Sequence, residues 1–304
     1  MRRRWRAALA IGVAAACVGS QARSLRYCDA QTALNATQQD KLLRVSAIIK
    51  AELDRSGASL AIIARSGLNL GLFGMRYSHA GLSLQASPET RWAVRQLYFA
   101  CDEQQPRLFD QGLSAFVLGT DEPALGFVSV VLLPAAAASA LEGVALDKRQ
   151  ALQLLGATYS ANAYAYSVRY QNCNQWLVEL LATAWGVKQP DTQPDAQPRA
   201  AAQGWLQATA YEPTVFQLPF RPALWLTAFS PWLNHDDHPE EDLAQARLRV
   251  SMPASIEAFV RGQYPAAQRL EFCHTERHVV LRRGWEAIAD GCVPGEGDTV
   301  LPLD

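Results

Sequence analysis

Residues 170–176 read YQNCNQW, and they lead into a strong helical pattern that continues to residue 184. Apolar residues follow Cys173 at helical spacing, at Leu177, Leu180, Leu181 and Ala184, so we expect a helix that begins near Cys173 and docks on a sheet. The thiol lies on the docking face. Backbone N–H groups at a helix start lower the pKa of a thiol and offer hydrogen-bond donors to an oxyanion. Cys173 is therefore a candidate nucleophile.

A second stretch, RYSHAGL at residues 76–82, places a histidine on an expected strand. Alternation along that strand, residues 77–85, predicts that Tyr77, His79, Gly81 and Ser83 share one face. Gly81 and Ser83 are small, so another element can approach this face closely.

An imidazole beside Cys173 would complete a Cys–His pair, a common way to activate a thiol. His79 is the candidate for that base. The base in such a pair is normally oriented by a third polar group, and the next expected strand, residues 92–101, offers Gln96. A single histidine on a strand, or a single cysteine at a helix start, is more often structural, so the hypothesis depends on the two lying together.

The N-terminus has the pattern of a secretory signal peptide. Four arginines, Arg2, Arg3, Arg4 and Arg6, precede an apolar run over residues 7–18, and Ser20-Gln21-Ala22 has the form of a cleavage site. The run is shorter than the about 20 residues that a membrane-spanning helix needs. We expect residues 1–22 to be a signal peptide and the mature protein to be periplasmic. An uncleaved membrane anchor, which would be the chain's only membrane contact, and lipidation at Cys17 remain alternatives.

The charge of the chain argues against a nucleic-acid partner. The formal net charge of the 304 residues is −1, and removal of the four N-terminal arginines moves it to −5. Binding to nucleic acid would ask for a basic stripe. We also expect no cofactor.

One polar cluster contains residue types that bind metals. His235, Asp236, Asp237 and His238 are consecutive, so their side chains point in different directions, and no matching ligand spacing occurs elsewhere. We expect a polar loop before a helix that begins at Pro239. The sequence does not define any further role for the cluster.

Five cysteines remain after signal-peptide removal: Cys28, Cys101, Cys173, Cys273 and Cys292. Cysteines of exported proteins tend to pair, and an odd number leaves one over. Cys273 and Cys292 flank a hairpin-like stretch and are a natural pair, and Cys28 could pair with Cys101. Cys173 is then the free thiol, although parity does not prove this connectivity.

The chain divides into four expected segments: the signal peptide at 1–22, a core at 23–187, a proline-rich linker at 188–199 and a C-terminal extension at 200–304 that packs on the core. Periodicity predicts helices at 29–56, 135–141, 147–155, 174–184, 200–208 and 255–261. It predicts strands at 60–64, 77–85, 92–101, 116–118, 127–133, 215–218, 248–251, 270–273 and 278–281.

The order of a histidine strand, a polar strand and an Asn-Cys helix resembles the circularly permuted branch of the NlpC-type papain-like superfamily, which includes lecithin retinol acyltransferase-like proteins. The matching residues are SHAG at 78–81 and NCNQW at 172–176. The resemblance implies an α+β fold, with a circularly permuted papain-like core whose antiparallel sheet packs on the cysteine-bearing helix, plus a C-terminal α/β extension.

The mature chain also resembles, over nearly its full length, the bacterial family of exported proteins called domain of unknown function 2145. That resemblance rests on residues 76–81, 108–112, 170–176, 236–239 and 251–255.

The superfamily resemblance assigns roles to three residues. Cys173 would be the nucleophile, His79 the base, and Gln96 stands where the superfamily often has a histidine or a carboxylate. A glutamine can orient an imidazole but cannot stabilise imidazolium through charge. Residues near this triad, Tyr77, Ser78, Asn172 and Asn174, are candidates to line a substrate groove.

Three functional hypotheses follow. The first is an exported Cys–His hydrolase or acyltransferase that cleaves an amide, peptide or ester bond through a thioester at Cys173, with a murein peptide or an acyl-bearing molecule as substrate. The second is a non-catalytic binding protein that keeps a papain-like groove. The third is a structural module with Cys173 in a disulfide. The oligomeric state is left open.

Overall fold

The computed structural model describes residues 34–100, 103–186, 197–219, 224 and 232–303. The expected signal peptide, Cys28, Cys101 and residues 188–196 of the expected linker lie outside the described residues. Within these described ranges, no helix combines the length and the apolar character that a bilayer crossing demands.

The first described helix, α1 (Ala36–Ser56), has clear start and stop signals. The side chain of Asn35 accepts from the backbone N–H of Gln38, whose own side chain accepts from the N–H of Asn35, and this reciprocal pair caps the first turn. Gly57, at a φ of 70°, ends the helix. The helix thus begins at residue 36, inside the segment expected from residue 29.

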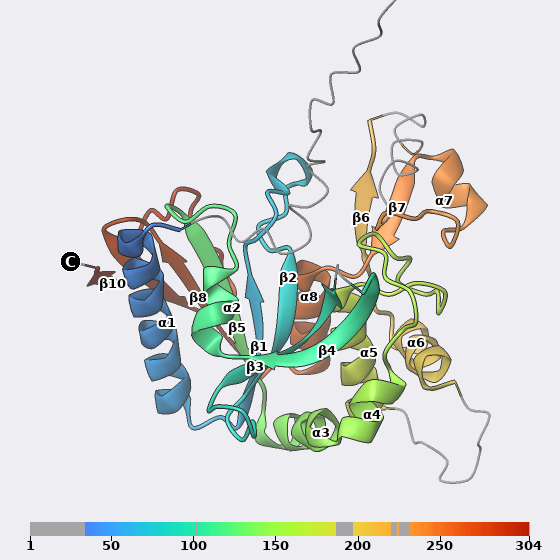
Figure 1. Ribbon diagram of the computed structural model, residues 1–304, viewed down its shortest axis with the longest axis horizontal. Coiled ribbons are helices and arrows are strands. Elements are labelled where there is room, and N and C mark those ends of the chain that lie inside the picture. Colours follow the sequence, from blue (N-terminus) through green and yellow to red (C-terminus); the bar gives the residue numbers. More distant parts are fainter. Residues whose placement is uncertain (1–33, 101–102, 187–196, 220–223, 225–231, 304) are drawn as a thin grey trace, which may run out of the picture.

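Eight antiparallel strands form one sheet in the order β10-β9-β8-β5-β1-β2-β3-β4. Their bounds are β1 (Leu60–Arg65), β2 (His79–Leu84), β3 (Ala93–Ala100), β4 (Gln105–Gln111), β5 (Gly126–Leu132), β8 (Gln268–His274), β9 (His278–Arg283) and β10 (Thr299–Pro302). Because β8 pairs directly with β5, the C-terminal strands continue the sheet of the core (Figure 1).

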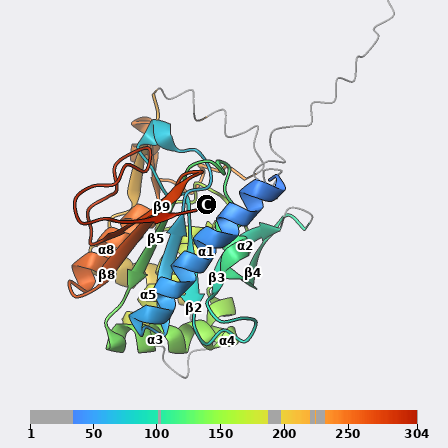
Figure 2. The same ribbon diagram turned by 90° about the vertical axis from the view of Figure 1, so that its left-hand side faces the viewer.

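Helices cover both faces of this sheet. The remaining helices are α2 (Leu113–Leu118), α3 (Ala135–Leu146), α4 (Lys148–Gln153), α5 (Cys173–Trp185), α6 (Pro198–Ala208), α7 (Glu240–Ala244) and α8 (Pro253–Gln263), with a short 3₁₀ turn at Gly71–Phe73. One apolar cluster packs α1 and α2 against one face, and a larger cluster packs α3, α5, α6 and α8 against the other. Figure 2 shows α1 crossing in front of the strands, and the fold is α+β with a large antiparallel sheet.

A second, two-stranded sheet stands apart from the main one (Figure 1). It pairs β6 (Thr214–Gln217) with β7 (Arg247–Val250), and α7 packs beside it. A bridge between Tyr164 and Val250 connects it to the loop that leads toward α5.

Two local predictions were wrong. Residues 116–118, expected as a strand, belong to α2, because Leu113, Phe116 and Val117 bury one face at helical spacing. Strand β4 was not expected, because it lies at the sheet edge with every residue but Pro106 exposed or half-buried, without the apolar alternation of a covered strand. The helix expected at 200–208 is present as α6 and begins two residues earlier, with Pro198 in its first turn.

The expected disulfide between Cys273 and Cys292 is confirmed, with the two Cα atoms 5.6 Å apart. It ties β8 to the segment between β9 and β10. Cys173 is a free, buried thiol.

A buried ion pair joins α5 to α6. Glu179 is fully buried, and its carboxylate accepts from Nε of Arg199 at 2.9 Å and from the side-chain amides of Gln171 and Gln203, each at 2.7 Å. Burial raises the pKa of Glu179, while Arg199 and the two amides oppose that rise. Arg199 also donates to the carbonyl oxygens of the loop before the helix, at Ser167, Val168 and Tyr170.

Replacing Arg199→Met should lower the free energy of unfolding by about 3–5 kcal/mol, because it leaves a buried carboxylate without its counter-ion. Urea unfolding followed by circular dichroism measures the loss. Arg44→Met, which breaks an exposed pair with Asp40, is the matched control and should cost less than about 1 kcal/mol. Adding Glu179→Gln to Arg199→Met should restore part of the stability. Equal losses of unfolding free energy for Arg199→Met and Arg44→Met would contradict the role of Arg199 as the counter-ion of a buried carboxylate.

Candidate active site

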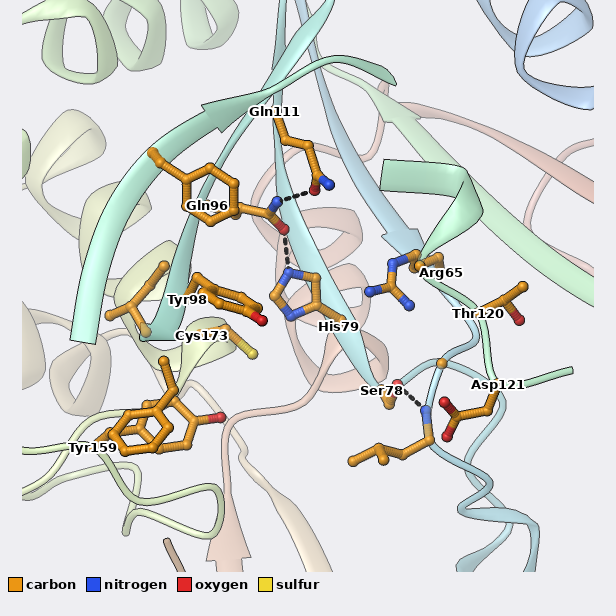
Figure 3. A pocket seen from close by; sticks show the side chains of 16 residues that line it. Arg65, Ser78, His79, Gln96, Tyr98, Gln111, Thr120, Asp121, Tyr159 and Cys173 are labelled. Carbon is orange, nitrogen blue, oxygen red and sulfur yellow. Dashed lines mark hydrogen bonds between the residues drawn. The ribbon is translucent and has the colours of Figure 1, made fainter. Parts of the chain in front are cut away.

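A cavity of about 470 Å³ opens where the ends of β1 and β2, the strands β3 and β4, and the start of α5 come together (Figure 3). Cys173, His79 and Gln96 all line it, so the structure places the three candidate residues at one site. Ser78 lines the cavity too, and its hydroxyl accepts from the backbone N–H of Leu68 at 3.1 Å.

Cys173 is the first residue of α5, and two asparagines fix the start of that helix. The side chain of Asn172 caps the helix by accepting from the N–H of Gln175 at 2.7 Å. The side chain of Asn174 accepts from the N–H of Ala80 at 3.0 Å and donates to the carbonyl of Ser78 at 3.2 Å. These two backbone groups flank His79. Asn174 therefore fixes the cysteine helix against the strand that carries the histidine.

His79 is held by a chain of two amides. Its Nε2 makes a hydrogen bond with Oε1 of Gln96, and Nε2 of Gln96 donates to Oε1 of Gln111 at 2.6 Å (Figure 3). Since Gln96 presents its oxygen to the ring, Nε2 of His79 carries the proton. Nδ1 is then the unprotonated nitrogen, and this is the atom that can accept a proton from a thiol.

The close approach of β3 depends on Gly81. A Cβ atom at position 81 would lie 2.7 Å from a methyl group of Val94, 2.9 Å from the carbonyl of Arg95 and 3.2 Å from Cβ of Gln96. Only a residue without a side chain lets β3 cross β2 this closely, and this crossing brings Gln96 to His79.

Arg65 is a fourth functional group of the cavity. It is the last residue of β1 and lies opposite His79 in the antiparallel register. Its guanidinium carbon lies 5.3 Å from the ring centre of Phe116, and the His79 ring packs on the same phenyl group at 5.9 Å. Burial lowers the pKa of Arg65 to about 10, and Asp121, which also lines the cavity, acts to raise it.

Burial dominates the ionisation of the pair. It raises the pKa of the Cys173 thiol to about 12, although the N–H groups of Asn174, Cys173 and Ala80 and the charge of Arg65 act to lower it. Burial and the charge of Arg65 lower the pKa of His79 to about 3, against the hydrogen bond that Nε2 donates to Gln96. The helix start thus has the expected effect on the thiol, but desolvation outweighs it. Both groups are uncharged at neutral pH.

Cys173 and His79 share the cavity but are not hydrogen-bonded to each other in the described part of the chain. Such contacts in ligand-free sites are often long and tighten when substrate binds. The arrangement provides an uncharged thiol, an imidazole with a free Nδ1, backbone donors near the sulfur and one cation.

Three groove candidates do not line the cavity. Tyr77 precedes β2, so strand alternation does not apply to it, and its hydroxyl donates to Glu271 beside a different cavity. Asn172 and Asn174 are buried supports of the helix start and do not line the cavity.

The polar cluster before α7 has structural contacts. Asp237 accepts from the N–H of Tyr164 at 2.9 Å, and Nε2 of His238 contacts the carbonyl of Asn162 at 2.8 Å. Helix α7 directly follows Pro239 rather than beginning at it. Across the described residues, no three histidine, cysteine, aspartate or glutamate side chains are grouped to hold a metal.

Sequence reasoning missed Arg65, Gln111 and Asp121. Arg65 directly follows the apolar run at 60–64, and a charge at the end of a buried strand is a usable signal. Gln111 belongs to the unexpected β4, and Asp121 lies in a loop whose path only the fold defines.

The fold and site define an α+β protein with a thiol, an imidazole and a guanidinium in one cavity. Comparison with protein families matches residues 52–260 to the family described as uncharacterized protein conserved in bacteria, DUF2145. The chain belongs to this family, the domain of unknown function 2145. No curated protein and no solved structure matches the chain.

Replacing Gln96→Glu should raise the pKa of His79 from about 3 toward its ordinary value of about 6.5, because a carboxylate at Nε2 stabilises imidazolium. Nuclear magnetic resonance of the imidazole signals against pH measures the change. Gln105→Glu, at an exposed position of β4, is the control and should leave the pKa of His79 unchanged. A His79 titration unaffected by Gln96→Glu would contradict the hydrogen-bonded chain.

Proposed function

We propose that this protein is an exported cysteine hydrolase or acyltransferase that cleaves an amide, peptide or ester bond through a thioester at Cys173. The observation that carries the proposal is the shared cavity. A free thiol at a helix start and an imidazole oriented by Gln96 line the same space, with Nδ1 of the imidazole unprotonated.

In the proposed reaction, the sulfur of Cys173 attacks the substrate carbonyl carbon while Nδ1 of His79 accepts the thiol proton. Throughout the reaction, Nε2 of His79 keeps its own proton and donates it in the hydrogen bond to Gln96. The N–H groups of Cys173 and Asn174 lie near the sulfur and would donate to the oxygen of the tetrahedral intermediate. The intermediate collapses as His79 returns the proton to the leaving amine or alcohol. Water or another acceptor then attacks the thioester carbonyl while Nδ1 of His79 takes its proton. The bond from carbon to sulfur breaks, the acyl product leaves and the proton returns to the sulfur of Cys173.

The compartment narrows the proposed substrate. The signal-like N-terminus and the disulfide between Cys273 and Cys292 both favour an oxidising envelope compartment such as the periplasm. Murein peptides are present there, and acyl groups of lipids are the second substrate class. The order of the His79 strand, the Gln96 strand and the Cys173 helix also supports our proposal that the core is a circularly permuted papain-like fold.

A second candidate function is non-catalytic binding in the same cavity. It is favoured by the pKa values of about 12 for Cys173 and about 3 for His79, which keep both groups uncharged without a ligand. The structural hypothesis, in which Cys173 forms a disulfide, does not fit its free thiol.

Reaction of native protein with iodoacetamide separates the two functions. If His79 is the base, His79→Ala should slow alkylation of Cys173 at pH 7.5 by about 100-fold or more. Mass spectrometry of the Cys173 peptide gives the rate. His278→Ala, a partly buried histidine on β9 outside the cavity, is the matched control and should alkylate like wild type. Equal rates in wild type and His79→Ala would leave only the binding function.

The pH dependence of this alkylation is an independent prediction. Between pH 5 and 9 the wild-type thiol stays protonated and His79 stays neutral, so direct proton transfer gives a nearly constant rate. In His79→Ala the free thiolate must form first, and the rate should rise about tenfold per pH unit. The same steep rise in wild type would contradict general-base catalysis by His79.

A further inference from the structure

Arg65 lies beside the two reactive groups by strand register. It is opposite His79 on the neighbouring strand, so the two side chains leave the sheet on the same face with Cβ atoms roughly 5 Å apart. Both line the cavity that contains Cys173, and in Figure 3 the guanidinium points toward that space.

The donors of Arg65 are mostly unused by the described protein. One terminal nitrogen donates to the carbonyl of Ser66 at 3.3 Å, while Nε is buried and has no hydrogen-bond partner among the described residues. A guanidinium has five N–H donors in a planar fork. A buried donor without a partner carries a desolvation cost that a bound acceptor would remove.

The position of the guanidinium is built into the surrounding backbone. A Cβ atom at Gly67 would lie 2.6 Å from Nη1 of Arg65, and one at Gly119 would lie 2.7 Å from Nη2. Two glycines thus leave the space that the guanidinium fills, and Phe116 packs against it. The guanidinium therefore occupies this space in the ligand-free protein, with Phe116 against it.

Arg65 is also the cation of the cavity. Among the described lining residues, the only other side chain charged at neutral pH is Asp121, since His79 and Cys173 are uncharged. Asp121 raises the pKa of Arg65, but no salt bridge at 4.0 Å or less joins them in the described chain. The charge of Arg65 favours the thiolate of Cys173, yet the pKa of the thiol still lies well above neutral. Activation of the thiol therefore does not explain this arginine.

We propose that Arg65 binds a carboxylate of the substrate, placed within a few bonds of the carbonyl that Cys173 attacks. This inference rests on the proposed function and narrows its substrate class to acyl compounds with a free carboxylate near the scissile bond, such as a peptide cleaved close to its C-terminus. The planar fork matches a carboxylate in a bidentate manner, which the single ammonium of a lysine cannot do.

Two small reagents of nearly equal size test the charge requirement. Iodoacetate and iodoacetamide both form a bond from sulfur to carbon and release iodide, but only iodoacetate carries a carboxylate, which is bonded directly to the reacting carbon. The measurement is the ratio of their alkylation rates at Cys173, read by mass spectrometry of its peptide. The same peptide in urea-unfolded protein gives the intrinsic ratio. A ratio cancels any change in thiolate content that a variant causes.

The iodoacetate-to-iodoacetamide ratio should be about tenfold or more higher in native wild type than in unfolded protein. Arg65→Gln should return it to the unfolded value, and Arg65→Lys should restore it in part. Arg44→Gln removes the same charge on α1, outside the cavity, and should keep the wild-type ratio. Asp121→Asn, which retains Arg65, should raise the ratio further and tests the proposal if Arg65→Gln fails to fold.

The outcomes are separable from those of the proposed function. A native ratio equal to the unfolded one, or a preference that persists in Arg65→Gln, would overturn the carboxylate site. This holds even where iodoacetamide labelling still depends on His79. Conversely, labelling that is indifferent to His79→Ala overturns the catalytic proposal whatever the ratio.

Discussion

The buried pair of Glu179 and Arg199 is the interaction on which the position of the nucleophile depends. Arg199 reaches from α6 to the carboxylate on α5 and to three carbonyls of the loop that enters the helix. Gln171, two residues before Cys173, donates to the same carboxylate. A charge inside the protein is tolerable only with such complete pairing. The loop before Cys173 therefore takes the path that satisfies Glu179.

A second constraint acts at the other end of this connection. Asn174 binds the backbone of the residues on both sides of His79, so the helix start and the histidine strand are placed together. The same tight packing removes water from the thiol and the imidazole, and both lose the tendency to ionise. Rigid placement and low charge are thus two results of one arrangement. Arg65, at the end of β1, provides positive charge in a cavity whose reactive groups have none.

Much of the fold was readable from periodicity. Several elements lie within a few residues of their predicted positions: helices α1 and α5 and the apolar strands β1, β5 and β8. Burial of one face or of both faces dictates the composition of these elements. Strand β4 was missed because an exposed edge imposes little pattern, and α2 because six residues fit either period.

The candidate site was predictable where local chemistry determines it. A cysteine at a helix start and a histidine on a strand can be recognised one at a time, and the amide chain from His79 through Gln96 extends that expectation. The presence of Arg65 in the site could not be predicted from the sequence, because it depends on the register between β1 and β2 and on the space at Gly67 and Gly119. Tyr77 was misplaced because it lies just outside the strand whose alternation was applied to it.

The continuity of the sheet has a consequence for the order in which the protein can be made. Strands β8 to β10 come last in the chain, yet β8 pairs with β5 in the middle of the sheet. During synthesis Cys173 emerges well before Cys273 and Cys292, while the far half of the sheet is still missing. Of the elements that contact α5, strands β2 and β3 and helix α3 precede Cys173 in the chain, and α6 and α8 follow it but precede Cys273. Early packing of this half would shield the thiol from incorrect pairing while the last two cysteines find each other.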